Sequence, residues 1–183
     1  MISPKTNPHI TALLQQAFSL HQQGKLPKAL KIYQRVLKAE PKNFLALDGL
    51  GTLYGQQRQF EAALKCFDQA AAVQPNDFAV HFNQGMALKE LKRYEEAQTC
   101  FANAITLKPD FAEAYNSQGS VLKELKRIEE ALACFDKAIT LKPNYPNAYN
   151  TRGATYQETQ QFEKALSDFD RAIALNPGFA EAY

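Results

Sequence analysis

A period of 34 residues runs through this chain and limits its fold more than any other sequence feature. The hexapeptide LKELKR, for example, occurs at 88–93 and again at 122–127. Repetition with a period of roughly 20–50 residues is typical of arrays in which each small unit buries the apolar face of its neighbour. Glycine, alanine and proline follow the period most strictly. The recurring positions, which we expect to be structural, are Gly51, Gly85, Gly119, Gly153, Ala63, Ala97, Ala131, Ala165, Pro75, Pro109, Pro143 and Pro177.

Each repeat contains two segments with helical periodicity. In the fourth repeat, apolar residues at helical spacing occupy 114–125 and 128–141, with a short break near Lys126. Pro143 follows the second segment, where proline is common because it cannot continue a helix. The pattern therefore predicts two helices per repeat. Asparagine or aspartate near the start of each first helix favours N-capping, at Asn7, Asn43, Asp77, Asp110 and Asn144.

The glycines of the first helices need a packing explanation. Glycine inside a helix is less favourable than alanine by about 1 kcal/mol. A close approach between the two helices of one repeat would offset this cost. We predict that Gly119 crosses near Ala131, and that Tyr115, Leu122 and Phe135 fill the space around the crossing.

In the fourth repeat the recurring pattern consists of Tyr115, Gly119, Leu122, Ala131, Phe135, Ala138 and Pro143. This pattern closely resembles the tetratricopeptide repeat family. The resemblance implies an all-α fold, an α-solenoid of antiparallel helix-turn-helix hairpins wound into a right-handed superhelix. The expected organisation is a leader at 1–9, five repeats at 10–43, 44–77, 78–111, 112–145 and 146–179, and the start of a truncated sixth repeat at 180–183.

The position immediately before the recurring glycine departs from the family pattern. Gln84, Gln118 and Arg152 occupy it, whereas leucine is common there in the family. This departure predicts more polar packing between the helices of this chain.

Composition argues against several classes of partner. The formal net charge is only +2, so no strong electrostatic attraction to nucleic acid or to anionic lipid is expected. No apolar run approaches the roughly 20 residues of a membrane span. The first residues lack the apolar core of a secretory signal. We therefore predict a cytoplasmic protein that binds neither nucleic acid nor membrane.

The sequence contains few groups arranged for chemistry. Cys66, Cys100 and Cys134 lie 34 residues apart, a spacing set by the repeat that does not match metal ligands. Motifs for nucleophilic, metallopeptidase or phosphate-binding sites are absent from the sequence. The pairs Glu95–Glu96 and Glu129–Glu130 begin second helices, where acidic side chains favour the helix dipole. We predict no enzymatic activity, no cofactor and no metal.

Binding is the function that the resemblance implies. In the family, the first helices of successive repeats line a concave groove that accommodates a protein or peptide. The N-terminal half of this groove carries apolar residues and the C-terminal half carries amides and hydroxyls, an arrangement suited to an extended peptide or an amphipathic helix. The alternative is that the apolar residues cover seams between hairpins or contact the leader. The predicted peptide-binding residues are Leu14, Phe18, Leu45, Thr52, Gln56, Phe82, Asn83, Met86, Asn116, Ser120, Lys123 and Asn150.

Two other functions stay open at this stage. The repeats also resemble those that precede the catalytic domain of O-linked N-acetylglucosamine transferases, which would make the chain a substrate-recruiting arm of a larger enzyme such as a glycosyltransferase. Alternatively, the apolar face of the fifth hairpin, with Phe169, Ile173 and Leu175, could stack on another copy and form a homo-oligomer through the uncapped C-terminal end. The leading hypothesis is a non-catalytic interaction scaffold.

Overall fold

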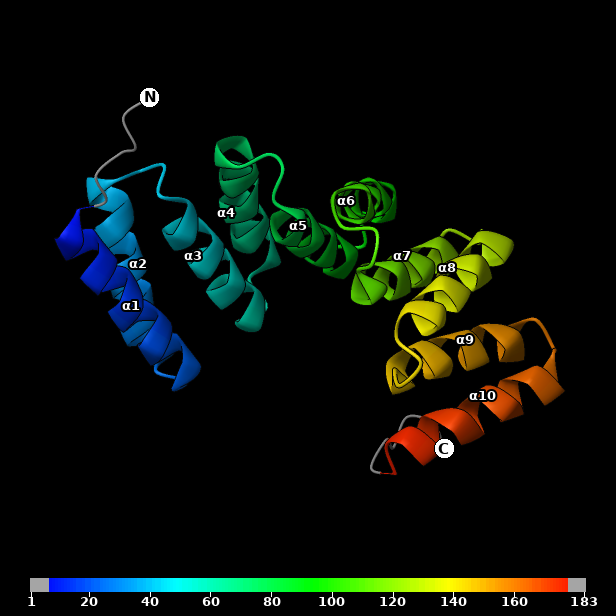
Figure 1. Cartoon of the computed structure of the whole chain (residues 1–183). Helices are drawn as coiled ribbons and strands as arrows, with labels where there is room; N and C mark the ends of the chain where they lie inside the picture. Colours follow the sequence, from blue (N-terminus) through cyan, green and yellow to red (C-terminus); the bar gives the residue numbers. More distant parts are fainter. Residues whose placement is uncertain (1–6, 178–183) are drawn as a thin grey trace. The chain divides into compact units, whose positions relative to one another are not determined.

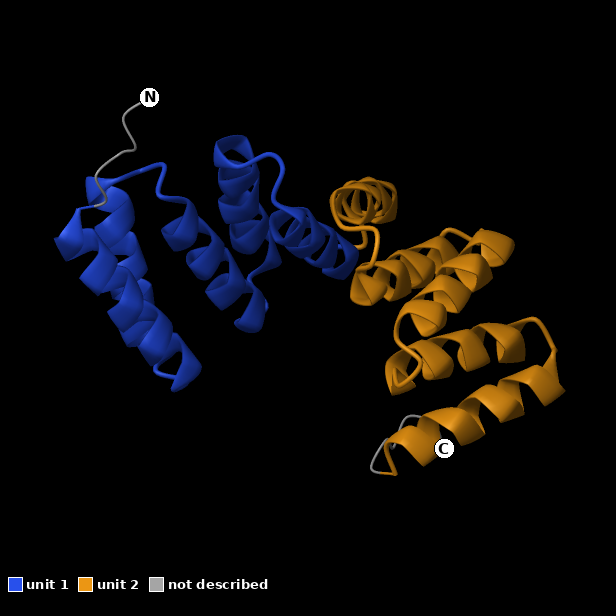
Figure 2. Ribbon diagram, viewed as in Figure 1, with its two compact units in different colours: residues 1–91 blue, residues 92–183 orange. Residues whose placement is uncertain are grey.

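The computed structural model describes residues 7–177, which form ten α-helices and no β-strand. The chain divides into two compact units, residues 1–91 and 92–183, which we call the N-terminal half and the C-terminal half (Figure 2). The predicted all-α fold is therefore confirmed.

The N-terminal half contains two complete helical hairpins and one further helix (Figure 1). Within it, α1 packs against α2, α3 packs against α4, and α5 packs against α4. The helices α1, α3 and α5 also contact one another in sequence order. The helices are α1 (Pro8–Gln22), α2 (Leu26–Ala39), α3 (Phe44–Gln56), α4 (Phe60–Val73) and α5 (Phe78–Glu90).

The C-terminal half begins with a single helix that packs against the first of two hairpins. The pairs α7–α8 and α9–α10 form these hairpins, α6 packs against α7, and α8 packs against α9. The helices are α6 (Tyr94–Leu107), α7 (Ala112–Glu124), α8 (Ile128–Leu141), α9 (Pro146–Glu158) and α10 (Phe162–Leu175).

The exact division into 34-residue repeats stays a prediction. Of the expected leader at 1–9, residues 1–6 lie outside the described part of the chain, and residues 8 and 9 already belong to α1. The expected start of a sixth repeat at 180–183 also lies outside the described residues.

A residue in the left-handed conformation marks the turn that follows each first helix. These residues are Gly24, Arg58, Lys92, Lys126 and Gln160, with φ between 58° and 70°. After α7, for instance, the Arg127 backbone N–H donates 2.9 Å to the Leu122 carbonyl, and the Lys126 N–H donates to Lys123. This pattern is a Schellman motif, which satisfies the last carbonyls of a helix.

The predicted N-caps are right for three helices and wrong for two. Asn7, Asn43 and Asp77 each accept a hydrogen bond from a backbone N–H of the helix that follows. The equivalent N-cap slots of α7 and α9 hold Phe111 and Tyr145, one residue after Asp110 and Asn144. These aromatic residues have no capping oxygen in reach. Their rings instead lie under lysine ammonium groups, Lys108 at 5.2 Å and Lys142 at 4.8 Å.

The glycines lie directly against aromatic residues of the second helices. A Cβ placed on Gly119 would lie 2.6 Å from the ring of Phe135, whose atoms are the three nearest, and Phe135 is one of the residues predicted to fill the space around the crossing. The same relation joins Gly51 to Phe67 and Gly153 to Phe169. Because Phe135 is fully buried, its ring cannot move aside. The glycine therefore makes room for the aromatic residue of the second helix, and Ala131 is buried nearby in the same cluster.

Candidate functional site

The face formed by α1 and α3 has two exposed apolar side chains. Phe18 is 36% exposed and Leu45 is 48% exposed. Both line a cleft of about 470 Å³, together with Gln15 and Glu40. The ring of Phe18 stands edge-on to Tyr33 with centroids 5.9 Å apart, which fixes its orientation. Leu14 is buried at the base of this cleft and belongs to the core.

A second hollow lies among α3, α4 and α5 and has a volume of about 380 Å³. It brings together four of the residues predicted to bind peptide. Its wall is mostly apolar, with hydroxyl, amide and carboxylate groups from three side chains. The lining residues are Thr52, Gly55, Phe60, Ala63, Phe67, Phe82, Asn83, Met86, Ala87 and Glu90. We call this hollow the α3–α5 pocket.

Gln56, which was also predicted to bind peptide, does not line the pocket. It is exposed, and its Oε1 lies 3.0 Å from His21 Nε2 on α1. His21 in turn contacts Tyr33, with Nδ1 3.5 Å from the phenol oxygen.

A polar link beside the pocket joins α5 to α3. Asn83 Nδ2 donates a hydrogen bond of 3.2 Å to Asp48 Oδ1. Burial raises the pKa of the Asp48 carboxyl, the hydrogen bond from Asn83 lowers it in part, and the charge of Asp77 adds to the rise. The net result is a carboxyl that holds its proton more tightly than usual. The Nδ2 of Asn83, at the wall of the pocket, thus bonds within the protein.

In the C-terminal half, two of the four predicted peptide-binding residues, Asn116 and Lys123, bond a neighbouring helix, and Ser120 bonds its own helix. Asn116 is buried, and its Oδ1 accepts a 2.7 Å hydrogen bond from the Thr151 hydroxyl. Ser120 donates 3.0 Å to the Asn116 carbonyl. Lys123 forms an ion pair of 2.9 Å with Glu158. Asn150 Oδ1 is the one buried side-chain oxygen or nitrogen among the described residues that lacks a hydrogen-bond partner.

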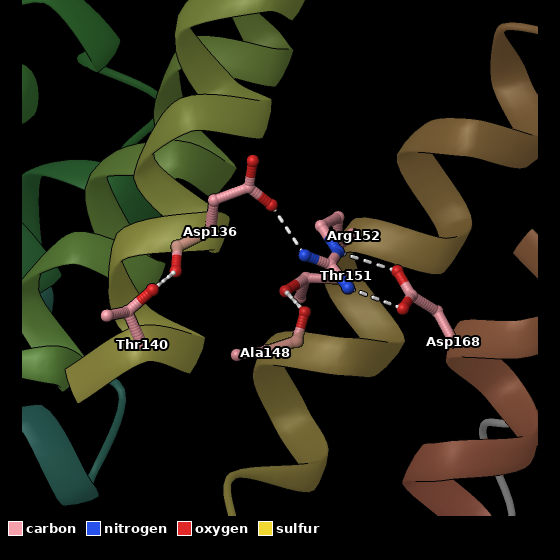
Figure 3. Close-up of polar contacts among 6 residues, drawn as sticks. All are labelled: Asp136, Thr140, Ala148, Thr151, Arg152 and Asp168. Carbon is pink, nitrogen blue, oxygen red and sulfur yellow. Dashed lines mark hydrogen bonds and ion pairs between the residues drawn. The ribbon is translucent and has the colours of Figure 1, made fainter. Parts of the chain in front are cut away.

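The side chains in the polar slot before the glycine bond carboxylates of second helices. Gln84 donates 2.8 Å to Asp68 of α4. Arg152 on α9 lies between two aspartates from different helices, Asp136 on α8 and Asp168 on α10 (Figure 3). It forms a two-pronged pair with Asp168 at 2.7 Å and 2.6 Å. The two carboxylates raise the pKa of the Arg152 guanidinium further above its ordinary value, so the group stays charged.

Several side chains that could carry chemistry are buried or bonded within the protein. Burial raises the pKa of the thiols of Cys66 and Cys134 to about 11 in each case, which keeps both protonated near neutral pH. Glu96 and Glu130 each bind the arginine three residues earlier, and these hydrogen bonds lower the pKa of both carboxyls. His81 is half-buried, and its Nε2 lies 2.8 Å from the Pro75 carbonyl.

Within residues 7–177, no three or more His, Cys, Asp or Glu side chains gather into a group that could hold a metal ion. No helix within the same range combines the length and the apolar character that a membrane crossing requires.

Helical hairpins of constant size, stacked so that first helices contact first helices, define an all-α helical-repeat protein of the α-solenoid class. Four models of the tetratricopeptide repeat match this chain, at residues 11–43, 49–97, 119–160 and 146–179, and together they span most of it. The chain belongs to the tetratricopeptide repeat family.

Several solved structures share this fold. YrrB, described as a tetratricopeptide protein with an unusual peptide-binding site, is 25% identical, with a TM-score of 0.77 over 93% of this chain and 88% of that one. MamA is 23% identical, with a TM-score of 0.81 over 94% of each chain. PilF of Pseudomonas aeruginosa is 22% identical, with a TM-score of 0.83 over 94% of this chain and 79% of that one. No curated protein matches the sequence significantly.

Proposed function

We propose that this protein is a non-catalytic scaffold that binds a peptide segment of a partner along the first helices of its N-terminal half. The observation that carries the proposal is the α3–α5 pocket, a mostly apolar hollow of about 380 Å³ in the same half as the exposed Phe18–Leu45 cleft. Small-ligand and side-chain sites are typically concave and mostly apolar, with a few polar groups that orient the ligand.

Two further observations support this function. The solved neighbour YrrB is described as having a peptide-binding site, and it shares the fold over most of both chains. The amide and hydroxyl groups of the C-terminal half are largely occupied by bonds within the protein, such as that between Thr151 and Asn116. The N-terminal half therefore offers the better surface for a partner.

A peptide selection tests the proposal. Peptides selected against the full chain from a random displayed library are titrated against the wild type and against Phe18→Ser and Leu45→Ser. Leu45 is 48% exposed and Phe18 is 36% exposed, so we expect little change in the helical circular dichroism. We expect each variant to weaken binding by about tenfold, the scale of losing one apolar contact residue.

Leu107→Ser is the matched control, because Leu107 is 38% exposed but lies on α6 in the other half. It should leave the affinity unchanged. Selected peptides that bind the two N-terminal variants as tightly as the wild type would contradict the proposed site.

Self-association is a second candidate, favoured by the face of α10. Phe162 and Leu166 are 63% and 62% exposed. Leu64, the equivalent of Leu166 on α4, is only 8% exposed, and α4 packs against α5. Of the residues predicted from the sequence to form this face, Phe169, Ile173 and Leu175 are each partly buried. The exposed surface therefore lies nearer the start of α10 than expected.

Most of the exposed side chains of α1 are polar, among them Gln16 and Ser19. The exposed surface of α1 thus differs from the apolar face of α10, so we propose face-to-face pairing of α10 with α10 of a second copy rather than stacking of α10 on α1. Sedimentation velocity over a concentration series tests this. A dimer that is lost in Leu166→Glu supports the pairing, and a monomer at all concentrations overturns it.

A further inference from the structure

We propose that the α3–α5 pocket is a specific site for an aromatic side chain of the partner, and that Gly55 creates it. The inference rests on the proposed function and names the chemical class of the residue that anchors the peptide. It is carried by a comparison between two hairpins of the same chain.

Gly55 is not required by packing. A Cβ built on it meets no atom within 4 Å, whereas one built on Gly51 in the same helix would lie 2.6 Å from Phe67. Glycine inside a helix is also less stable than alanine. The open space beside Gly55 is therefore free volume that an alanine could enter without a clash.

The other repeats fill the slot of Gly55 with a long side chain. The residues 34 positions apart are His21, Lys89, Lys123 and Gln157. Only the second repeat has glycine there, and the hollow in question is lined by this glycine. The pocket thus coincides with a missing side chain.

The first hairpin shows what fits in this slot. His21 on α1 stands edge-on to Tyr33 of α2, with ring centroids 6.2 Å apart and an angle of 78° between the rings. In the second hairpin the equivalent of Tyr33 is Phe67, which lines the pocket, and the equivalent of His21 is Gly55. The second hairpin therefore has the ring equivalent to Tyr33, that of Phe67, but has no ring equivalent to His21.

The rest of the wall suits an aromatic guest. Phe60 and Phe82 add two more aromatic rings, and Met86 adds a thioether, which makes favourable contacts with ring edges. Thr52, Asn83 and Glu90 supply the polar groups that can bond the guest's backbone. A ring from a peptide would take the place against Phe67 that His21 takes against Tyr33.

Nuclear magnetic resonance titration of the isotope-labelled full chain tests the site directly. The probe is N-acetyl-phenylalanine amide, and N-acetyl-alanine amide is the control ligand. We expect saturable shifts for the signals of Thr52, Met86 and Ala87 with the phenylalanine probe and none with the alanine probe. Equal responses to the two probes, or shifts centred elsewhere, would overturn the proposal.

Gly55→His restores the arrangement of the first hairpin and should close the pocket. We expect it to weaken binding of the phenylalanine probe by about tenfold or more, the scale set by burying a phenyl group. Gly55→Leu fills the same space without a ring and should act alike, which covers the case that one variant folds poorly. Gln157→His is the matched control, because it places the same residue in the same slot of α9, and it should leave binding unchanged.

The outcome also separates this inference from the proposed function. Selected peptides that lose affinity in Phe18→Ser but keep it in Gly55→His would overturn the aromatic pocket and leave the scaffold function standing. A library that yields no peptide, although the phenylalanine probe binds and Gly55→His abolishes it, would overturn the scaffold function and support the pocket.

Discussion

Asn83 donates a hydrogen bond to Asp48, a residue 35 positions earlier in the chain. The same offset joins Thr151 to Asn116 at 2.7 Å and Lys123 to Glu158 at 2.9 Å. Since the sequence period is 34, each of these bonds connects a residue with the neighbour of its equivalent. First helices of successive repeats are therefore linked one position out of register.

The half-buried Asp48 carboxyl predicts a pH-dependent effect of Asp48→Asn. The pKa of this carboxyl is raised in the folded protein, so its protonated form stabilises the fold, and that contribution is lost as the pH rises through the folded pKa. Asparagine has no charge to bury and can still accept the hydrogen bond from Asn83. We expect Asp48→Asn to be more stable than the wild type at pH 7.

Urea denaturation measured between pH 7 and about pH 4 checks this, because the advantage of asparagine should shrink as Asp48 gains its proton. Asp170→Asn in the middle of α10, an exposed aspartate given the same substitution, is the matched control. An advantage that stays constant over this pH range would show that the charge of Asp48 is not its cause.

Two glycine-to-alanine changes should have opposite effects on stability. Gly119→Ala forces a methyl group to within 2.6 Å of the buried Phe135 ring, so we expect a loss of about 1–3 kcal/mol. Gly55→Ala enters open space and should gain up to about 1 kcal/mol from helix propensity. Thermal melts monitored by circular dichroism compare the two variants, and a shift of the same sign in both would refute the packing assignment.

The Arg152–Asp168 pair predicts a large effect when one partner is removed. Both side chains are mostly buried, at 18% and 7% exposure. Arg152→Leu would leave the Asp168 carboxylate without its cation, and breaking such a pair costs about 3–5 kcal/mol. The double variant Arg152→Leu with Asp168→Leu removes both charges and should recover most of the loss.

Chemical denaturation of the two single variants and the double variant measures the coupling between these residues. Lys164→Ala, which removes an exposed cation from α10, serves as the reference for a surface change. If the double variant is no more stable than Arg152→Leu alone, the uncompensated charge is not the source of the instability.

The thiols should be inert in the folded protein. Burial raises the pKa of Cys66 and Cys134 to about 11, from an ordinary value of 9.0. The folded state therefore holds these protons more tightly than the unfolded state, and the associated stability falls as the pH rises from 9 through 11. A thiol reagent at pH 8 should label Cys66 and Cys134 only after denaturation, as peptide mass mapping would show. Rapid labelling of Cys66 in the native protein would contradict this.

The period and the helical spacing within it sufficed to predict the hairpins. The segment 128–141, inferred from the apolar stripe and Pro143, coincides with α8, because a repeat supplies several copies of the same signal. The sequence placed Phe135 near the crossing of Gly119 and Ala131, but it did not specify which side chain lies directly against the glycine. That contact depends on how the two helices cross, which a linear pattern does not give.

The candidate site was only partly readable. Phe82 and Met86 were identified from the groove position of their helix, and both line the α3–α5 pocket. The pocket itself depends on an absent side chain, which appears only when Gly55 is compared with His21 and Lys89 in register. Asn116 was predicted to bind the ligand from the groove position of its helix, although burial and the bond from Thr151 engage it within the fold.

The bridge that Arg152 forms between α8 and α10 depends on which hairpin precedes α9. Arg152 bonds Asp136 of the preceding hairpin, and the residue one period before Asp136 is Ala102. Excising residues 112–145 as one block would keep every turn and helix intact, yet it would set Arg152 opposite an alanine. Hairpins of nearly identical shape are therefore not interchangeable. Loss or shuffling of a whole repeat would remove bonds between the hairpins that become neighbours.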